Sequence, residues 1–313
     1  MSERPLAVGE NILCRPFYLV RALRLPFVSA SLLPFLLGSL INKNAFHFSA
    51  FFLGLASVVC THLGANLLND YADSRSGVDW QDGKFYGFFG GSKLIQQGVF
   101  TERFYLGLGV LFFALSVACV IALSFLLRDL RAAGFYSVII FLGITYSHKP
   151  LQLSYHYLGE LVIFLLFGPA LVMGGYFLQT GIFPHIKSLL VSLPMGLLVF
   201  GILFANEVPD YPQDKKCAKF NLVSLLGPER AYLFYLLINV AAFFSIALNI
   251  NRGYFSRWAY LSFLFIPLVL RAGFVLKGSQ EKIRLVESSK IAIATHIFVS
   301  IVLIVDLLLW KRY

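Results

Sequence analysis

The residues best suited to chemistry form a stripe of amides and carboxylates. Asn66, Asn69, Asp70 and Asp73 are offset by 3, 4 and 7 positions, which places them on one face of a helix. Carboxylates on adjacent turns repel each other unless a cation or a proton lies between them. A divalent cation is the natural partner of such a stripe at the end of an apolar helix, although a solvated helix end shows the same pattern.

A second stripe follows more than 130 positions later. Asn206, Asp210 and Asp214 are offset by 4 and 8 positions, again on one helical face. Pro209 and Pro212 interrupt backbone hydrogen bonding, so we expect a kink or a break there. An ordinary polar loop would explain this segment alone. Because an Asn followed by carboxylates at helical spacing occurs twice, a shared site is the better interpretation.

Two facing carboxylate stripes with Mg²⁺ between them would bind a diphosphate. Mg²⁺ binds through a few carboxylates together with phosphate oxygens, and it turns the diphosphate into a leaving group. Lys93, Lys149 and Lys219 lie in polar segments and would hold the remaining oxygens as point charges. A diphosphate beside an apolar interior that accepts a hydrocarbon tail is the arrangement expected for a prenyl diphosphate.

The composition indicates that these stripes belong to an integral membrane protein. Of the 313 residues, 58% are hydrophobic and only 13% are charged, whereas soluble proteins carry roughly 25% charged residues. A mean hydropathy of +0.76, with 32 Phe and 15 Tyr, argues against a water-soluble enzyme, and the same figures exclude disorder and coiled coil. The net charge of +10 does not indicate nucleic acid, because the basic residues lie in short segments between apolar runs. We expect no required protein partner.

The apolar stretches predict one all-α domain over residues 1–313. About nine transmembrane helices would surround a central cavity closed by polar cap loops. The predicted spans are 25–42, 44–69, 104–127, 132–147, 161–184, 188–206, 231–251, 258–270 and 291–305. The Lys- and Glu-containing segment 280–290 is interpreted as a solvated loop, and His62 as a polar packing residue, since no His pair has metal-ligand spacing.

The charges predict which side of the membrane carries the stripes. With nine spans and the N-terminus inside, the inner segments hold 18 of the 26 Lys and Arg residues. They also hold 14 of the 16 acidic residues. We therefore expect a multi-pass protein of the lipid bilayer, in a bacterial inner (plasma) membrane, with its active site on the cytoplasmic side.

The paired stripes resemble those of the UbiA superfamily of intramembrane prenyltransferases. The pattern Asn66-x-x-Asn69-Asp70-Tyr71-x-Asp73-x-x-x-Gly77-x-Asp79 is similar to the first motif of its dihydroxynaphthoate (MenA) branch. The second motif of that branch resembles Asn206-x-x-x-Asp210-x-x-x-Asp214, followed by Lys219 and Leu225-Leu226-Gly227. Between the motifs, Gly90-Gly91-Ser92-Lys93, Thr145 to Pro150 and Leu158-Gly159-Glu160 recur in the expected order, and Arg24-Leu25-Pro26 resembles the entry to the first span.

The resemblance implies an Mg²⁺-dependent transfer of a polyprenyl group from polyprenyl diphosphate to an aromatic acceptor, in menaquinone-type quinone biosynthesis. It implies Asp70, Asp73, Asp210 and Asp214 as catalytic metal ligands, with Asp79 as a further candidate. Asn66, Asn69, Asn206 and the three lysines would bind the diphosphate, and Arg24, Tyr146 and Glu160 would lie near the acceptor or the cavity mouth. The chain departs from the family pattern at Ala218, where glycine is common, at Asn221, where threonine is usual, and at Glu207 and Pro209.

The spacing of the third carboxylate bears on the acceptor. Asp79 follows Asp73 by six residues with Gly77 between them, whereas the 4-hydroxybenzoate branch usually spaces them by four. We expect the helix to end near Gly77 and Asp79 to return toward the site from a loop. This spacing favours dihydroxynaphthoate. The alternatives are 4-hydroxybenzoate, haem or a phosphosugar as acceptor, or a cation-coupled transporter, whose site belongs near mid-membrane.

Overall fold

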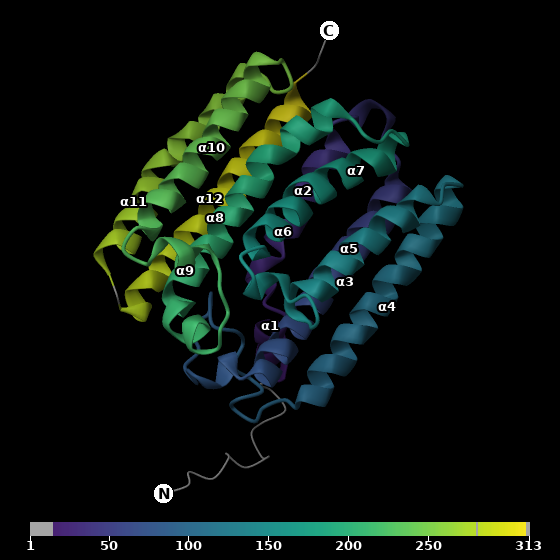
Figure 1. Cartoon of the computed structure of the whole chain (residues 1–313). Coiled ribbons are helices and arrows are strands. Elements are labelled where there is room, and N and C mark those ends of the chain that lie inside the picture. Colours follow the sequence, from purple (N-terminus) through teal and green to yellow (C-terminus); the bar gives the residue numbers. More distant parts are fainter. Residues whose placement is uncertain (1–14, 280, 311–313) are drawn as a thin grey trace, which may run out of the picture.

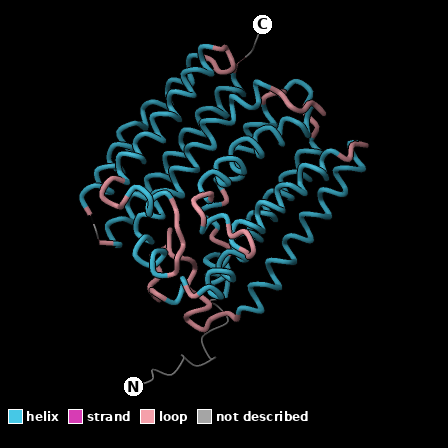
Figure 2. Tube along the Cα trace, in the orientation of Figure 1, coloured by secondary structure: helices cyan, strands magenta, loops and turns pink. Residues whose placement is uncertain are grey.

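The computed structural model describes residues 15–279 and 281–310, and this part of the chain is all-helical with no named strand. Figure 1 shows long helices that run side by side as a bundle, and Figure 2 shows that loops gather at the two ends of that bundle. The helices are α1 (Arg15–Ala22), α2 (Ser29–Leu40), α3 (Phe48–Ser76), α4 (Glu102–Leu127), α5 (Arg131–Ser147), α6 (Gly159–Leu165), α7 (Leu171–Thr180), α8 (Ile186–Lys216), α9 (Leu222–Leu226), α10 (Ala231–Asn251), α11 (Ile266–Gly278) and α12 (Lys282–Leu309).

Short helical turns complete the described chain. They are the 3-10 turns η2 (Leu25–Phe27), η3 (Lys43–Ala45), η4 (Val78–Trp80), η5 (Leu153–Tyr155) and η7 (Arg257–Phe265), and the π-helical segment η6 (Leu166–Ala170). The segment η6 joins α6 to α7, so 159–180 forms one spanning unit.

Seven helical units in the described residues are long and apolar enough to cross a bilayer, and an eighth is formed by the bent pair of α1 and the segment 25–40. Each of the nine predicted stretches overlaps a helical unit, although the stretch 161–184 runs past the end of α7 at Thr180. The fourth stretch corresponds to α5, whose 17 residues fall below the length of the others, so the count of nine is not established.

Three helices are longer than the apolar stretches that predicted them. The helices α3, α8 and α12 extend by 7 to 10 residues, many of them polar, beyond those stretches. The segment 282–290 is therefore the first part of α12, and its interpretation as a solvated loop was wrong. A helix continues past its apolar part because backbone hydrogen bonds propagate once the helix exists.

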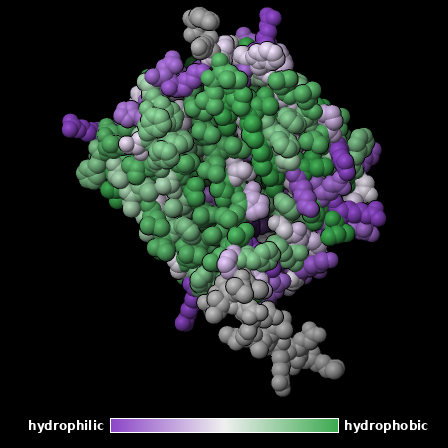
Figure 3. All heavy atoms as spheres, turned by 180° about the vertical axis from the view of Figure 1, so that it is seen from behind, coloured by the Kyte–Doolittle hydropathy of each residue, from purple (hydrophilic) through white to green (hydrophobic). Residues whose placement is uncertain are grey.

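The main core lies where α8 packs against α10 and α12. Phe204, Tyr235 and Leu303 are fully buried there. On the outside, large apolar side chains such as Phe125 are exposed, and Figure 3 shows a broad hydrophobic area over one face of the bundle. A soluble protein rarely exposes so large an apolar surface, and lipid is the solvent that this surface fits.

Candidate active site

The first stripe ends as the sequence predicts. The helix α3 carries Asn66, Asn69, Asp70 and Asp73 and stops at Ser76, where Gly77 adopts a φ of 86°. The chain then turns through η4, so Asp79 comes back toward the stripe with only 4% of its surface exposed. Gly91 packs closely against the Asp79 carboxylate: a Cβ added at position 91 would lie only 2.6 Å from Asp79 Oδ2.

The second stripe lies on one unbroken helix. The helix α8 passes through Pro209 and Pro212 and ends at Lys216, so the expected break is wrong. Each of these two prolines removes one backbone hydrogen-bond donor. Both lie in the polar end of the helix and not in its apolar middle. Asn206, Asp210 and Asp214 therefore keep their helical spacing and face the cavity together.

The two stripes meet through Lys219, which lies in the loop after α8. Its Nζ is 3.8 Å from Asp73 Oδ2 on α3 and 3.7 Å from Asp214 Oδ1 on α8. Burial lowers the pKa of Lys219, but Asp214 and Asp73 outweigh this effect and raise it well above its usual value. The loop turns at Ala218, whose φ of 52° explains why a glycine suits this position.

Hydrogen bonds from neighbouring side chains hold these carboxylates in place. The Tyr155 hydroxyl donates to Asp73 Oδ1 at 3.1 Å, and Asn221 Nδ2 donates to Asp214 Oδ2 at 3.1 Å. Asn221 also caps α9 through Ser224 N. Neither Tyr155 nor Asn221 was predicted to belong to the site, because their contacts depend on how the loops fold back over the stripes.

The loop between α3 and α4 closes the site from the other side. Lys93 donates to the Asp79 carboxylate and to the Asp79 carbonyl, both at 2.9 Å, and Gly90 N donates to Asp210 Oδ2 at 2.9 Å. Burial, together with the nearby carboxylates of Asp73 and Asp70, raises the pKa of Asp79 to about 7, although Lys93 opposes this shift.

A basic residue that sequence analysis missed completes the charge pattern. Lys282, the first residue of α12, lies 2.9 Å from Asp82 Oδ2 and 4.0 Å from Asp210 Oδ1. Both Lys282 and Asp82 line the cavity. Both residues lie in polar segments of the sequence, and nothing in those segments predicts that Lys282 contacts Asp82 or Asp210.

Arg24 lies beside the carboxylates as well. It occupies the bend between α1 and η2 with a φ of 49°, and its guanidinium donates to Asp70 Oδ1. Ser92 N donates to the other oxygen of Asp70 at 3.1 Å. Both carboxylate oxygens of Asp70 therefore accept hydrogen bonds from the protein. Asp70 does not line the cavity, whereas the other four carboxylates do: Asp73, Asp79, Asp210 and Asp214.

Of the remaining predicted residues, some line the cavity and others lie outside it. Tyr146, Asn66 and Asn69 line the cavity; Asn66 donates to Leu23 O at 3.2 Å and Asn69 to Ser147 Oγ at 2.8 Å. Glu160 is buried behind the wall, where it accepts from Leu222 N at 2.6 Å. Lys149 is exposed in the loop after α5 and does not line the cavity.

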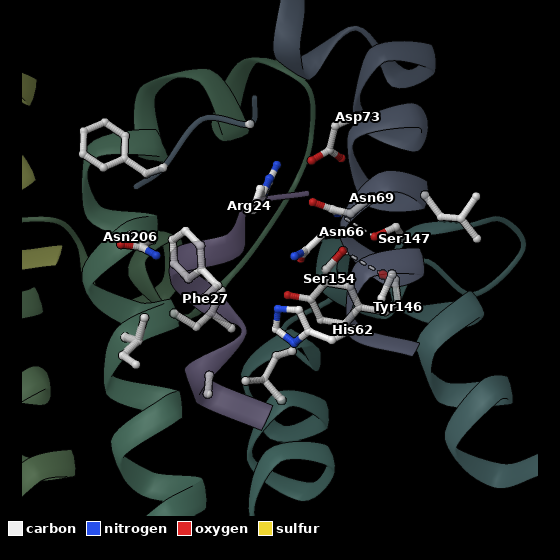
Figure 4. A pocket seen from close by; sticks show the side chains of 18 of the residues that line it. Arg24, Phe27, His62, Asn66, Asn69, Asp73, Tyr146, Ser147, Ser154 and Asn206 are labelled. Carbon is white, nitrogen blue, oxygen red and sulfur yellow. Dashed lines mark hydrogen bonds between the residues drawn. The ribbon is translucent and has the colours of Figure 1, made fainter. Parts of the chain in front are cut away.

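The cavity has a volume of about 340 Å³ and changes character along its depth. The carboxylates and lysines surround its mouth, and Figure 4 shows Asp73, Asn69, Asn66 and His62 following one another into it, with Asn206 on the opposite wall. Its deeper lining is mostly apolar and includes Phe113, Ile139 and Leu171. An amphiphile with an anionic head and a hydrocarbon tail fits this gradient.

The donor set fits Mg²⁺ that arrives with a phosphate ligand. Among the residues that the structure describes, no three carboxylate, imidazole or thiol groups converge closely enough to enclose an ion. The carboxylates instead stand on two facing walls and are bridged by lysines. Mg²⁺ commonly uses one or two carboxylates, several waters and the substrate phosphates, and such a shell requires this kind of open oxygen site.

Fold and site together define a helical membrane protein with an acidic, lysine-bridged mouth above an apolar cavity. The sequence profile of the UbiA prenyltransferase family matches residues 31–301, and the chain belongs to that family.

Individual relatives agree with this assignment. Over 290 residues the chain is 24% identical to 1,4-dihydroxy-2-naphthoate octaprenyltransferase of Bacillus subtilis, covering 90% of this chain and 89% of the relative. It is 27% identical over 225 residues to UbiA prenyltransferase domain-containing protein 1 of Xenopus tropicalis, covering 70% of this chain but only 62% of that longer relative. The fold matches a UbiA homologue of Archaeoglobus fulgidus bound to GPP and Mg²⁺ with a TM-score of 0.59 at 19% identity, over 92% of this chain and 99% of the other.

Proposed function

We propose that the protein transfers a polyprenyl group from polyprenyl diphosphate to an aromatic acceptor of the dihydroxynaphthoate type. The observation that carries this proposal is the contact of Lys219 with Asp73 and Asp214, which joins the two stripes over the mouth of one cavity. Stripes that meet in this way form one site for one diphosphate.

Each group at the mouth has a part in holding the donor. Asp73, Asp79, Asp210 and Asp214 line the mouth and would hold Mg²⁺. When bound, Mg²⁺ supplies charge neutralisation for the departing diphosphate. Lys93 and Lys219, now paired with carboxylates, are placed to contact phosphate oxygens as well. Asp70 and Arg24 act together, since Asp70 orients the guanidinium at the cavity wall.

The reaction replaces one bond of the donor and one bond of the acceptor ring by a new carbon–carbon bond. The bond between the allylic carbon and the diphosphate oxygen breaks, and diphosphate leaves with the electron pair. A carbon of the electron-rich ring forms the new carbon–carbon bond, and the ring loses a proton, or a carboxyl group as CO₂. The apolar cavity excludes water, which would otherwise capture the allylic centre.

Two related points support the dihydroxynaphthoate acceptor. The Bacillus subtilis relative is named for that acceptor. In addition, α3 ends at Gly77 and brings Asp79 back from a turn, the arrangement that distinguishes the spacing of this chain from the four-residue spacing. A multi-pass location in a bacterial inner membrane, with the mouth on the cytoplasmic side, belongs to the same proposal.

A competition assay tests the acceptor. One polyprenyl diphosphate is supplied with equal concentrations of 1,4-dihydroxy-2-naphthoate and 4-hydroxybenzoate, and the products are separated by mass spectrometry. We expect the prenylated naphthalene product to predominate. Predominant prenylation of the monocyclic acid would show that the position of Asp79 does not report acceptor choice.

The transporter alternative is disfavoured by where the carboxylates lie. Cation sites of secondary transporters lie near the bilayer midplane, whereas Asp73 and Asp214 lie within the last turns of α3 and α8. Magnesium-dependent release of diphosphate from a polyprenyl diphosphate separates the two functions, because a transporter would leave the donor intact.

A further inference from the structure

The polar stripe of α3 continues into the cavity beyond the residues discussed so far. His62 precedes Asn66 by four residues and Asp73 by eleven, which keeps it on the same helical face. A rise of 1.5 Å per residue places it about 6 Å from Asn66 and about 16 Å from Asp73 along the helix axis. His62 therefore lies well below the carboxylates, in the part of the cavity that is otherwise mostly apolar.

One nitrogen of the His62 ring has a hydrogen-bond partner and the other has none. Its Nδ1 lies 2.6 Å from Ser31 Oγ on α2, and the ring packs edge-on against Phe167 of η6 with centroids 5.8 Å apart. The residue is 8% exposed and lines the cavity, but its Nε2 is buried without a hydrogen-bond partner. Figure 4 shows the ring beside Tyr146 and below Asn66.

A second unpartnered polar atom belongs to a residue on the opposite wall of the cavity. Asn206 Oδ1, on α8, is also buried without a partner, and Asn206 lines the opposite wall. A buried polar atom without a partner costs free energy. Other residues that line the cavity, among them Glu207 and Gln213, carry such an atom too, so the lining indicates a ligand with polar groups. A hydrocarbon tail has none, and a diphosphate held at Asp73 is too far away to reach His62.

We propose that His62 binds the aromatic acceptor, with Nε2 hydrogen-bonded to a ring hydroxyl and Ser31 fixing the orientation of the imidazole. This inference rests on the proposed function and adds to it the residue that recognises the second substrate. Phe167 also lines the cavity, so an apolar aromatic ring lies beside His62 where the acceptor ring would bind. Phe167 belongs to the π-helical segment η6, and such segments frequently occur at functional sites.

The chain provides a matched control in His296 on α12. His296 is fully buried, and neither of its ring nitrogens has a hydrogen-bond partner, but it does not line the cavity. An unpartnered imidazole alone therefore does not distinguish the two histidines, whereas the cavity does. Replacing either residue removes a buried imidazole from a membrane helix, and only His62→Leu removes one from the cavity.

The experiment compares the Michaelis constants for both substrates in wild type, His62→Leu, His62→Gln, Ser31→Ala and His296→Leu. We expect His62→Leu to raise the Michaelis constant for the dihydroxynaphthoate acceptor about tenfold, the effect of one lost hydrogen bond, and to leave that for the polyprenyl diphosphate unchanged. His62→Gln should recover part of the loss, because its amide returns a polar group to this wall. Ser31→Ala should show a smaller effect in the same direction, and His296→Leu none.

Binding of 1-hydroxy-2-naphthoate, followed by its fluorescence, gives a second measurement that does not depend on transfer. Weaker binding to His62→Leu than to His296→Leu supports the inference. Equal binding to the two variants, or a parallel rise in the Michaelis constants for both substrates, would overturn it. If wild type transfers no prenyl group to any aromatic acceptor, the proposed function fails, and the fluorescence comparison still decides the role of His62.

Discussion

Lys219 Nζ lies 3.8 Å from Asp73 Oδ2, although the two residues belong to segments 146 positions apart in the chain. The contact places an ammonium between carboxylates of α3 and α8, where the proposed function requires a magnesium diphosphate. A lysine in this position stabilises the acidic walls before substrate arrives, and it remains beside the phosphate oxygens afterwards.

Replacing this lysine should impair catalysis more than folding. Lys219→Met removes the charge that lies against Asp73 and Asp214, so we expect kcat/KM to fall on the order of 10²-fold, as for loss of one preorganised electrostatic group. Steady-state transfer kinetics measure this loss. Lys216→Met, at an exposed position three residues earlier, is the control and should retain near wild-type activity. Similar rates for the two variants would remove Lys219 from the site.

The two other predicted lysines should behave differently from each other. Lys93 is 3% exposed and bonded to Asp79, whereas Lys149 is exposed outside the cavity. We therefore expect Lys93→Met to lower kcat/KM by at least tenfold and Lys149→Met to change it less than twofold, since exposed charges are screened. A large loss in Lys149→Met would show that the loop after α5 moves onto the substrate.

Gly91 should tolerate no side chain, for a reason that is separate from its backbone conformation. Gly91 and Gly98 both have positive φ values, 75° and 70°, so alanine is strained at either position. Only at Gly91 does a Cβ meet Asp79, and at Gly98 it meets nothing within 4 Å. We expect Gly91→Ala to lower transfer activity at least tenfold more than Gly98→Ala. Equal losses would mean that strain alone explains both variants.

The contact of Lys219 with Asp73 and Asp214 requires the ends of α3 and α8 to lie on the same side of the membrane. Because Lys219 joins the ends of α3 and α8, cysteines at Ser76 and Lys216 should react with a membrane-impermeant thiol reagent from the same side, in a variant without native cysteines. Asn44, before the start of α3, should label from the opposite side, since 29 residues of helix separate it from Ser76. We expect Ser76 and Lys216 to label from the cytoplasmic side. Labelling from opposite sides would separate the stripes.

Periodicity and hydropathy predicted much of this structure because they are local properties. The spacing of Asn66, Asn69 and Asp73 describes one face of α3, and the glycine at position 77 identified its end, which Asp79 follows. The apolar stretches located the helices because each stretch must be buried or face lipid. The extension of α8 through Pro209 and Pro212 escaped prediction, since a proline weakens a helix without always ending it.

Contacts between distant segments were beyond sequence analysis. Lys282 begins α12 and reaches Asp82 and Asp210, yet its neighbours in sequence are those of a polar loop. His62 has the spacing of the α3 stripe, and that spacing was the one available signal that it faces the cavity. Arg24 was expected near the acceptor or the cavity mouth, and its contact with Asp70 depends on the bend between α1 and η2.

The most direct test of the central claim, that both stripes serve one magnesium diphosphate, is magnesium-dependent diphosphate release by Asp73→Asn and Asp210→Asn. Asp129→Asn, at the N-terminal end of α5 and outside the cavity, is the control. The account predicts that excess EDTA abolishes release by wild type, that added Mg²⁺ restores it, and that each site variant releases diphosphate on the order of 10²–10³ times more slowly than the control. Full activity in EDTA, or a loss confined to one of the two stripes, would contradict it.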